Sequence, residues 1–286
     1  MMKMRHNYLI MALAVAALTC GAQGDFNTEM MLSTFQIVGP SSEHPNAVMS
    51  GTVFLMVKPS VKHPGNSLKV MFTANHVLAG IGGQSANVNF RVKNPDGSWH
   101  KKPLTFSIRN GTNNLWTTGK ESDIAAMFLP IPDELMPECA VSTGMLATEQ
   151  DLLTYEIHPG DQLSCLGYPL GLEGNDAGFP VLRMGTVASY PLTPVHNYPT
   201  FLFNFDVFGG NSGGPVYLDY IGRAYGGSIH ADKRIVLIAG IVLDEVDYVD
   251  VTKTLREDKT TKTPLALSKV IHAEYMKQLL DSIQEP

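Results

Sequence analysis

The hydrophobic residues of this chain gather in short runs that are separated by Gly, Pro, Asn and Asp. Such runs, rich in Val, Ile, Leu and Phe, are typical of β-strands. One set of expected strands comprises residues 51–57, 68–73, 88–92, 104–108 and 124–129. A second set comprises residues 163–167, 181–189, 201–205, 215–218 and 235–243. Repeated short strands of this kind predict an all-β barrel or sandwich rather than alternating βαβ units.

Turn-forming residues divide the chain. Asn94-Pro95-Asp96-Gly97 is a strong turn signal between two strands of the first set. Pro130, Pro132 and Pro137 mark a crossover between the two sets. We therefore expect an N-terminal β-barrel within residues 30–135 and a C-terminal one within residues 145–255.

A helix is expected after the second set, within residues 265–286. Apolar residues recur there at helical spacing, and Ser268 is a candidate N-cap. The residues of this apolar face are Ile271, Tyr275, Met276, Leu279, Leu280 and Ile283.

The N-terminus has the pattern of an export signal. Lys3 and Arg5 precede an apolar stretch, residues 9–18, that is too short to span a bilayer as a stable helix. Small residues follow, and we expect cleavage at the end of a signal peptide formed by residues 1–22. A lipoprotein beginning at Cys20 is an alternative, although the residues before it resemble a lipobox poorly. Both interpretations predict an exported protein, periplasmic or extracellular.

Composition and charge limit the classes of fold and partner that are expected. The formal net charge is −6 and 44% of the residues are hydrophobic, so a packed globular fold is expected. The absence of a basic run argues against nucleic acid or an anionic membrane as the main partner. Cys139 and Cys165 remain after signal cleavage. They form a disulfide, or Cys165 is a buried free thiol, and the sequence leaves both open. No residue spacing suggests a zinc site.

One glycine-rich segment carries the strongest chemical signal. Residues 210–215, GNSGGP, surround the hydroxyl of Ser212 with small residues, so that a substrate can approach it closely. Serine needs a neighbouring base to act as a nucleophile. His76, at the end of an apolar run, is the candidate base, and Asp123, at the start of another, is the candidate orienting carboxylate. The chain order His, Asp, Ser is one known arrangement of such a triad.

Three segments resemble the signature segments of chymotrypsin-like serine proteases. They are TANHVL at 73–78, SDIAAMFL at 122–129 and GNSGGPV at 210–216. The likeness is greatest to the secreted bacterial branch that includes the HtrA-type protease domain, although no room is expected after the last helix for a PDZ domain. It covers about residues 45 to 250. It implies two antiparallel six-stranded β-barrels, protein or peptide substrates, and no metal or organic cofactor.

The resemblance also assigns roles. Ser212 attacks the scissile carbonyl, His76 carries the proton and Asp123 orients His76, while the N–H groups of Gly210 and Ser212 form the oxyanion hole. Taken singly, His76 is equally well a core histidine and Asp123 a strand-end cap, but the ordered triple weakens that joint interpretation. The segment also fits the nucleophile elbow of α/β-hydrolases. That elbow requires a helix directly after the serine, where residues 213–218 are typical of a strand.

The candidate substrate-binding residues are Asp206, Val242 and Leu243. Asp206 lies six residues before Ser212, where trypsin-like relatives place the acid that binds Arg or Lys side chains, but it serves equally well as a turn cap. Residues 243–245, Leu-Asp-Glu, depart from the Ser-aromatic-Gly pattern of the family's substrate channel. This departure keeps a second function class open, a protease fold that no longer catalyses and only binds a partner. Processing of one specific partner is a third.

Two further expectations concern activation and the remaining histidines. Asn211 stands where digestive proteases have the Asp that pairs with a freed N-terminus, so we expect no zymogen switch and assign Ile37 and Val38 to a strand or the core. The other histidines are expected in loops or at the surface, and they include His158, His196, His230 and His272.

Overall fold

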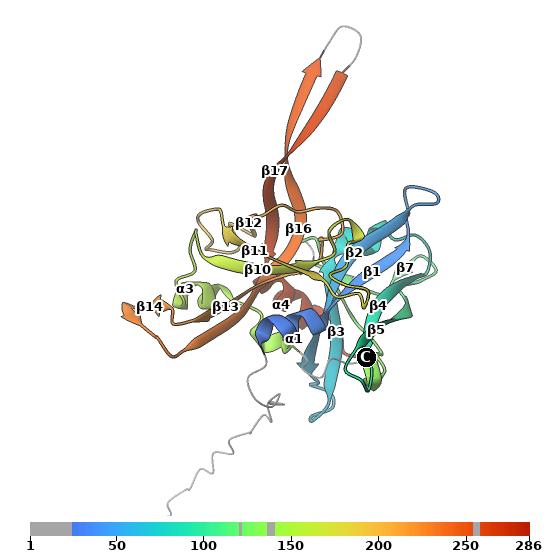
Figure 1. Ribbon diagram of the computed structural model, residues 1–286, viewed down its shortest axis with the longest axis horizontal. Helices are drawn as coiled ribbons and strands as arrows, with labels where there is room; N and C mark the ends of the chain where they lie inside the picture. Colours follow the sequence, from blue (N-terminus) through green and yellow to red (C-terminus); the bar gives the residue numbers. More distant parts are fainter. Residues whose placement is uncertain (1–24, 120–121, 136–140, 254–257) are drawn as a thin grey trace, which may run out of the picture.

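The structure is a computed structural model that describes residues 25–119, 122–135, 141–253 and 258–286. It consists of an antiparallel sheet and a closed antiparallel barrel, which lie beside each other (Figure 1). A two-stranded ribbon projects from the barrel, and a helix follows the last strand. The predicted all-β class with a C-terminal helix is confirmed, and the arrangement is consistent with a chymotrypsin-like fold.

The N-terminal half is a seven-stranded sheet in the order β5-β4-β1-β2-β3-β9-β8. Its strands are β1 (Thr34–Pro40), β2 (Val48–Pro59), β3 (Ser67–Ala74), β4 (Ser85–Lys93), β5 (Trp99–Ser107), β8 (Thr117–Thr118) and β9 (Ile124–Phe128). The two edges are not joined in the described residues, so this half differs from the six-stranded barrel that the resemblance implied. The outer strand β5 carries exposed Lys101, Lys102 and Pro103, which disfavour further strand pairing.

The predicted turn at residues 94–97 connects β4 to β5. The N–H of Gly97 donates to the carbonyl of Asn94 at 2.9 Å, and Asn94 and Ser98 close the hairpin. Residues 37 and 38 lie in β1, as expected from their apolar character, and β1 pairs with both β2 and β4. Two short strands, β6 (Arg109–Asn110) and β7 (Asn113–Asn114), form a separate hairpin.

The C-terminal half is a closed barrel in the order β10-β11-β12-β17-β16-β13. Its strands are β10 (Gln162–Gly167), β11 (Val181–Val187), β12 (Thr200–Asn204), β13 (Pro215–Ile221), β16 (Arg234–Lys253) and β17 (Asp258–His272). All the expected strands of the second set are present, but β17 was not predicted from the sequence. The barrel therefore continues to residue 272, beyond the predicted boundary at 255.

The strand β17 shortens the predicted C-terminal helix. Helix α4 covers Ala273–Ser282, and its N-cap is His272 rather than Ser268. Ser268 lies in β17 opposite Phe203 of β12, and its hydroxyl donates to the Phe203 carbonyl at 3.2 Å. Ile271 pairs with Ile241 in the barrel. A strand replaces the first predicted helical turn because these residues close the barrel between β12 and β16.

Beyond the barrel, β16 and β17 continue as the projecting ribbon. Their pairing runs from Asp247 opposite Pro264 to Lys253 opposite Asp258. The register shifts between residues 245 and 247, where the chain leaves the barrel. The ribbon thus begins directly after residues 243–245, which depart from the family's substrate-channel pattern.

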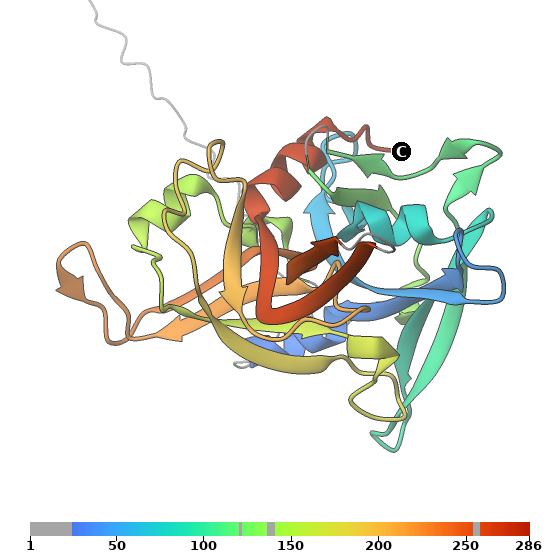
Figure 2. The same ribbon diagram turned by 90° about the horizontal axis from the view of Figure 1, so that it is seen from above.

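Helix α4 and the residues after it connect the two halves. The helix packs against β9 of the sheet and β16 of the barrel, and Figure 2 shows it over their junction. The Glu285 carboxylate then accepts hydrogen bonds from the N–H groups of Val61 and Lys62, from the Ser60 hydroxyl and from the Lys58 ammonium. These donors, chiefly the two N–H groups, lower the pKa of Glu285 to about 2.

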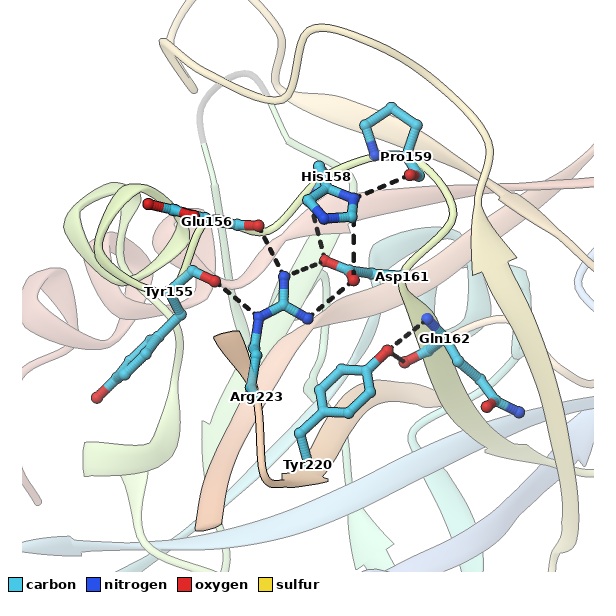
Figure 3. A network of polar contacts seen from close by, with 8 residues as sticks. All are labelled: Tyr155, Glu156, His158, Pro159, Asp161, Gln162, Tyr220 and Arg223. Atoms are coloured by element: carbon cyan, nitrogen blue, oxygen red, sulfur yellow. Dashed lines mark hydrogen bonds and ion pairs between the residues drawn. The ribbon is translucent and has the colours of Figure 1, made fainter. Parts of the chain in front are cut away.

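A buried ion pair between Arg223 and Asp161 stabilises the barrel. Arg223 donates through both terminal nitrogens to Asp161, at 2.6 and 2.8 Å, and also to the carbonyls of Tyr155 and Glu156 (Figure 3). Both charged side chains are 8% exposed. The hairpin β14 (Ala224–Tyr225) and β15 (Ser228–Ile229) follows Arg223, and the ion pair fixes it against the segment after helix α3 (Glu149–Thr154).

Two predictions about single residues are settled by burial. His272 was expected in a loop or at the surface, but it is buried beside Phe201, and this burial lowers its pKa to about 4. The prediction failed because His272 is the last residue of an unpredicted barrel strand. Cys165 is a buried free thiol, one of the two predicted alternatives, and burial raises its pKa to about 12. Cys139 and Cys20 lie outside the described residues.

Candidate active site

The structure brings His76 and Asp123 into direct contact. His76 lies in the short helix α2 (Asn75–Gly80), which begins where β3 ends. Asp123 lies directly before β9. Because Ala74 pairs with Ile124, His76 and Asp123 lie at the same end of the sheet. The Nδ1 atom of His76 is 2.5 Å from Oδ2 of Asp123. Because an ionised carboxylate only accepts hydrogen bonds, Nδ1 carries the proton and Nε2 is left as the basic nitrogen.

Backbone hydrogen bonds hold this pair in place. Oδ1 of Asp123 accepts the backbone N–H of His76 at 3.0 Å, and the Asp123 carbonyl accepts the N–H of Asn75 at 3.0 Å. The side-chain oxygen of Asn75 in turn accepts the indole N–H of Trp116 at 3.0 Å. Both carboxylate oxygens of Asp123 are therefore occupied by His76, which fixes the plane of the imidazole.

The Ser212 segment is held against the sheet by Thr52 of β2. The N–H of Thr52 donates to the carbonyl of Ser212 at 3.0 Å, and its hydroxyl donates to the carbonyl of Gly210 at 2.7 Å. The hydroxyl of Thr73 donates to the carbonyl of Thr52 at 2.7 Å. These two buried threonines join the barrel segment that carries Ser212 to the strand that leads into His76.

Gly213 lies at a tight contact between the two halves. Its φ is +86°, in the left-handed region that favours glycine. A Cβ atom at this position would overlap the carbonyl oxygen of Thr52 and the hydroxyl of Thr73, and would lie 3.0 Å from the N–H nitrogen of Ala74. Ala74 is two residues before His76, so the segment that carries Ser212 lies beside the segment that carries the imidazole.

The barrel holds the other side of the same segment through Val242 of β16. The N–H of Gly213 donates to the Val242 carbonyl at 2.8 Å, and the Val242 N–H donates to the Gly214 carbonyl at 2.9 Å. Val242, a predicted substrate-binding residue, is fully buried. Its backbone positions the serine segment, and its buried side chain belongs to the core.

The predicted oxyanion donors have free N–H groups. In the part of the chain that the structure describes, neither Gly210 nor Ser212 donates its N–H to a protein acceptor, whereas the N–H groups of Asn211, Gly213 and Gly214 are all bonded. Gly210 has a φ of +100°. A turn with two unbonded N–H groups beside a serine can bind an anionic oxygen.

The hydroxyl of Ser212 belongs to the segment that Thr52 and Thr73 join to the strand leading into His76. Among the described residues, no hydrogen bond joins Ser212 Oγ to the His76 ring. Ser212 is half-buried, and the His76 side chain is 42% exposed. A single side-chain rotation changes the distance between a serine hydroxyl and a neighbouring imidazole, and such bonds commonly form only when substrate is present.

Asp206 does not form the floor of an enclosed pocket. Its side chain is 54% exposed and lies 3.9 Å from the guanidinium of Arg183, which also donates to the Asp206 backbone carbonyl at 2.5 Å. The interpretation of Asp206 as a buried acid that binds basic side chains is therefore not supported. The negative charge is offset by Arg183 from the neighbouring strand β11.

An apolar pocket of about 620 Å³ lies beside the serine segment. Leu170, Leu172 and Phe208 line it, together with Pro169, Gly171, Val181 and Arg183. Leu170 and Phe208 flank Gly209, since the Leu170 N–H donates to the carbonyl of Gly209 at 2.6 Å and Phe208 precedes it in the chain. Leu243, which was predicted to bind substrate, is buried in β16 and does not line this pocket. The pocket was not predicted, because three separate segments form it.

Two other classes of site are absent from the described residues. No group of three or more His, Cys, Asp or Glu side chains there is arranged to hold a metal ion. None of the helices in that part of the chain has the length and apolar character needed to cross a membrane.

Comparison with known proteins returns proteases among solved structures. The chain is similar to the protease Anisep from Arthrobacter nicotinovorans, with 11% identity and a TM-score of 0.48, over 87% of this chain and 94% of that chain. It is also similar to a thermostable serine protease, AL20, from an extremophilic microorganism, with 13% identity, a TM-score of 0.46 and the same two coverages. No protein-family model and no curated protein matches.

Proposed function

We propose that this protein is a serine endopeptidase that hydrolyses peptide bonds through an acyl-enzyme, with Ser212, His76 and Asp123 as its catalytic residues. The proposal is supported chiefly by the hydrogen bonds that join the serine segment of the barrel to the sheet that carries His76 and Asp123. The sheet supplies an imidazole whose Nδ1 is bound by a carboxylate, and the barrel supplies a serine flanked by two unbonded N–H groups. Threonine hydrogen bonds hold the two contributions together.

In the proposed mechanism, Ser212 Oγ attacks the scissile carbonyl carbon while Nε2 of His76 takes the hydroxyl proton. The carbonyl oxygen becomes an oxyanion that accepts hydrogen bonds from the N–H groups of Gly210 and Ser212. His76 then gives its proton to the leaving amine, and the C–N bond breaks to leave an ester on Ser212. Water, deprotonated by His76, attacks the carbonyl carbon of this ester. The C–O bond to Ser212 then breaks, His76 returns the proton to Ser212 Oγ, and the carboxylic acid product leaves. Asp123 remains ionised and stabilises the imidazolium at each step.

We further propose that substrates place an apolar side chain near the scissile bond. The pocket beside Gly209 is lined mainly by apolar residues, including the exposed Leu170 and Leu172. Arg183 is its charged member, and Asp206 offsets that charge. A pocket of this character favours apolar over basic side chains, because an apolar group loses water contact there at a gain of about 25 cal/mol per Å².

Export belongs to the same proposal. Residues 1–22 have the charge and hydropathy of a signal peptide, and an endopeptidase of this kind acts on protein or peptide substrates outside the cytoplasm. Measurement of the mature N-terminus after expression with the signal tests this point, and distinguishes cleavage after residue 22 from a lipid-modified Cys20.

The proposal is tested with a fluorophosphonate probe, which forms a covalent bond with an activated serine. We expect the folded wild type to be labelled, and Ser212→Ala to lose both labelling and peptide cleavage. A peptide library scanned at each position then measures specificity, where preference for apolar over Arg or Lys residues is expected. Cleavage after Arg and Lys alone contradicts the specificity, and leaves the catalytic assignment standing.

A second candidate function is a binding module that kept the fold without catalysis. It is favoured by the unformed bond between Ser212 and His76 and by Leu243-Asp244-Glu245, which lead into the projecting ribbon. Absence of labelling in a protein that is folded by circular dichroism supports this alternative. Labelling without cleavage of any library peptide indicates an enzyme that processes one specific partner.

A further inference from the structure

A buried arginine outside the active site connects three segments of the chain. Arg91 lies in β4 and is 4% exposed. One terminal nitrogen, Nη2, donates to three backbone carbonyls at the end of helix α1 (Phe26–Ser33) and the start of β1. The acceptors are the carbonyl oxygens of Met31 at 2.8 Å, Leu32 at 3.1 Å and Thr34 at 2.8 Å.

The other terminal nitrogen of Arg91 reaches into the barrel half. Nη1 donates to the hydroxyl of Tyr168 at 3.1 Å and to the carbonyl of Gly178 at 2.9 Å. The guanidinium lies between the rings of Phe35 and Phe179, 4.3 and 4.5 Å from their centroids. A buried charge is costly unless it is hydrogen-bonded, and here oxygen dipoles and aromatic faces replace a carboxylate. No carboxylate forms an ion pair with Arg91 in the described part of the chain.

Tyr168 is the first residue of a loop that lies across the edge of the sheet. Its side chain is fully buried, and its hydroxyl is 3.0 Å from the carbonyl oxygen of Gly178 at the other end of the loop. Burial raises the pKa of Tyr168 to about 12, so the phenol keeps its proton at all ordinary pH values. On the outer side of the loop, Glu173 pairs with Lys101 of β5 at 2.8 Å. Arg91 thus closes the loop from residue 168 to residue 178 and binds it to β4.

The same loop supports the proposed oxyanion hole. The carbonyl oxygen of Tyr168 lies against Gly210, where a Cβ atom would overlap it, and the Leu170 N–H donates to the carbonyl of Gly209 at 2.6 Å. Leu170 has a φ of +53°, a left-handed conformation that is unfavourable for a leucine, and its side chain is 79% exposed. Burial of its own side chain therefore does not hold Leu170 in this conformation. The neighbouring anchor at Tyr168 and the bond to Gly209 hold it.

We propose that Arg91 is a positioning residue for the proposed peptidase reaction: through Tyr168 it holds residues 168–171 against Gly209 and Gly210, so that the Gly210 N–H faces the developing oxyanion. The inference rests on the proposed function. Arg91 touches no reacting atom. It acts through two contacts, from its guanidinium to the Tyr168 hydroxyl and from the Tyr168 backbone to Gly210.

Tyr168→Phe is the sharpest kinetic test, because it removes only the hydroxyl that Arg91 binds. We expect kcat to fall about tenfold or more with KM changed less than about twofold, since the loss of a whole oxyanion donor lowers kcat by about 10² to 10³.

Arg91→Ala should reduce kcat further, and added guanidinium ion should restore part of it. Arg223→Met is the matched control. It breaks another buried arginine network, away from Gly210, and should lower the unfolding temperature with kcat unchanged.

Hydrogen exchange supplies a readout that does not need activity. The N–H groups of Leu170 and Asn211 are bonded to Gly209 and Phe208, so their exchange reports on the loop directly. We expect both to exchange faster in Tyr168→Phe and to be unchanged in Arg223→Met. Unchanged exchange in Tyr168→Phe, or faster exchange with wild-type kcat, overturns the inference. If the wild type does not react with a fluorophosphonate, the proposed function fails, and exchange alone decides whether Arg91 controls this loop.

Discussion

Two hydrogen bonds join His76 to the carboxylate of Asp123, one from the ring Nδ1 at 2.5 Å and one from the backbone N–H at 3.0 Å. The backbone bond occupies Oδ1, which leaves Oδ2 for the ring. The orientation of the carboxylate is therefore set by the main chain, and the carboxylate sets the tautomer of the ring.

Asp123→Asn tests this arrangement. The amide oxygen can keep the bond from the His76 N–H, and the amide nitrogen then faces Nδ1 as a donor. The ring proton must then move to Nε2, and a protonated Nε2 can no longer accept the serine proton. We expect kcat to fall by about 10⁴ with little change in unfolding temperature, as in a comparable triad. Cleavage of a peptide substrate measures the effect. A loss of less than about tenfold contradicts the assigned role of Asp123.

Gly213→Ala tests the contact between the two halves. The new Cβ meets the Thr52 carbonyl and the Thr73 hydroxyl, and the backbone has a φ of +86°. Ser212 must move, and a displacement of about 1 Å lowers the rate by about 10². Gly144→Ala is the matched control, because its Cβ meets only the Ser142 hydroxyl at 3.4 Å. Probe labelling of the Gly213→Ala variant at the wild-type rate contradicts the geometry.

His272 makes the fold sensitive to acid. Its ordinary pKa is 6.5, and burial lowers the folded value to about 4. The unfolded chain therefore binds a proton first, so stability is lost as the pH falls from 6.5 to 4, by about 3 kcal/mol in total. We expect denaturant unfolding of His272→Phe to show a smaller loss over this range. Parallel pH curves for the two proteins contradict the prediction.

Glu285 also makes the fold less stable as the pH falls, but over a lower pH range than His272. Its pKa falls from 4.5 to about 2 on folding, so its contribution is fully present above pH 4.5 and disappears as the pH falls toward 2. We expect Glu285→Gln to unfold at a lower temperature than wild type at pH 6, and at the same temperature near pH 2. Glu43→Gln, in an exposed turn between β1 and β2, is the control and should match wild type at both pH values. A Glu285→Gln difference that persists at pH 2 is the contradicting result.

Much of the fold was predictable because strand periodicity and turn residues are local signals. The runs that became β2, β3, β9, β10 and β13 are apolar in sequence and buried in the structure. Strand β17 was missed because its apolar residues near 271 also fit a helix, and the choice between the two was made by pairing with β12 and β16. The open edge of the first sheet was missed for a similar reason, since strand pairing is decided between distant segments.

The sequence alone determined which residues have the chemistry of the site. A serine among glycines, a histidine after one buried strand and an aspartate before another are local features. Asp123 lies directly before a predicted strand, whereas His76 lies in the short helix α2, which was not predicted. Tertiary structure decided their surroundings. It joined Asp123 to His76 across paired strands, gave Asp206 an arginine partner, buried His272, and enclosed Arg91 between helix α1 and the loop at Tyr168. The physical reason is that burial and charge pairing depend on residues far apart in the chain, which only the folded backbone brings within a few ångströms.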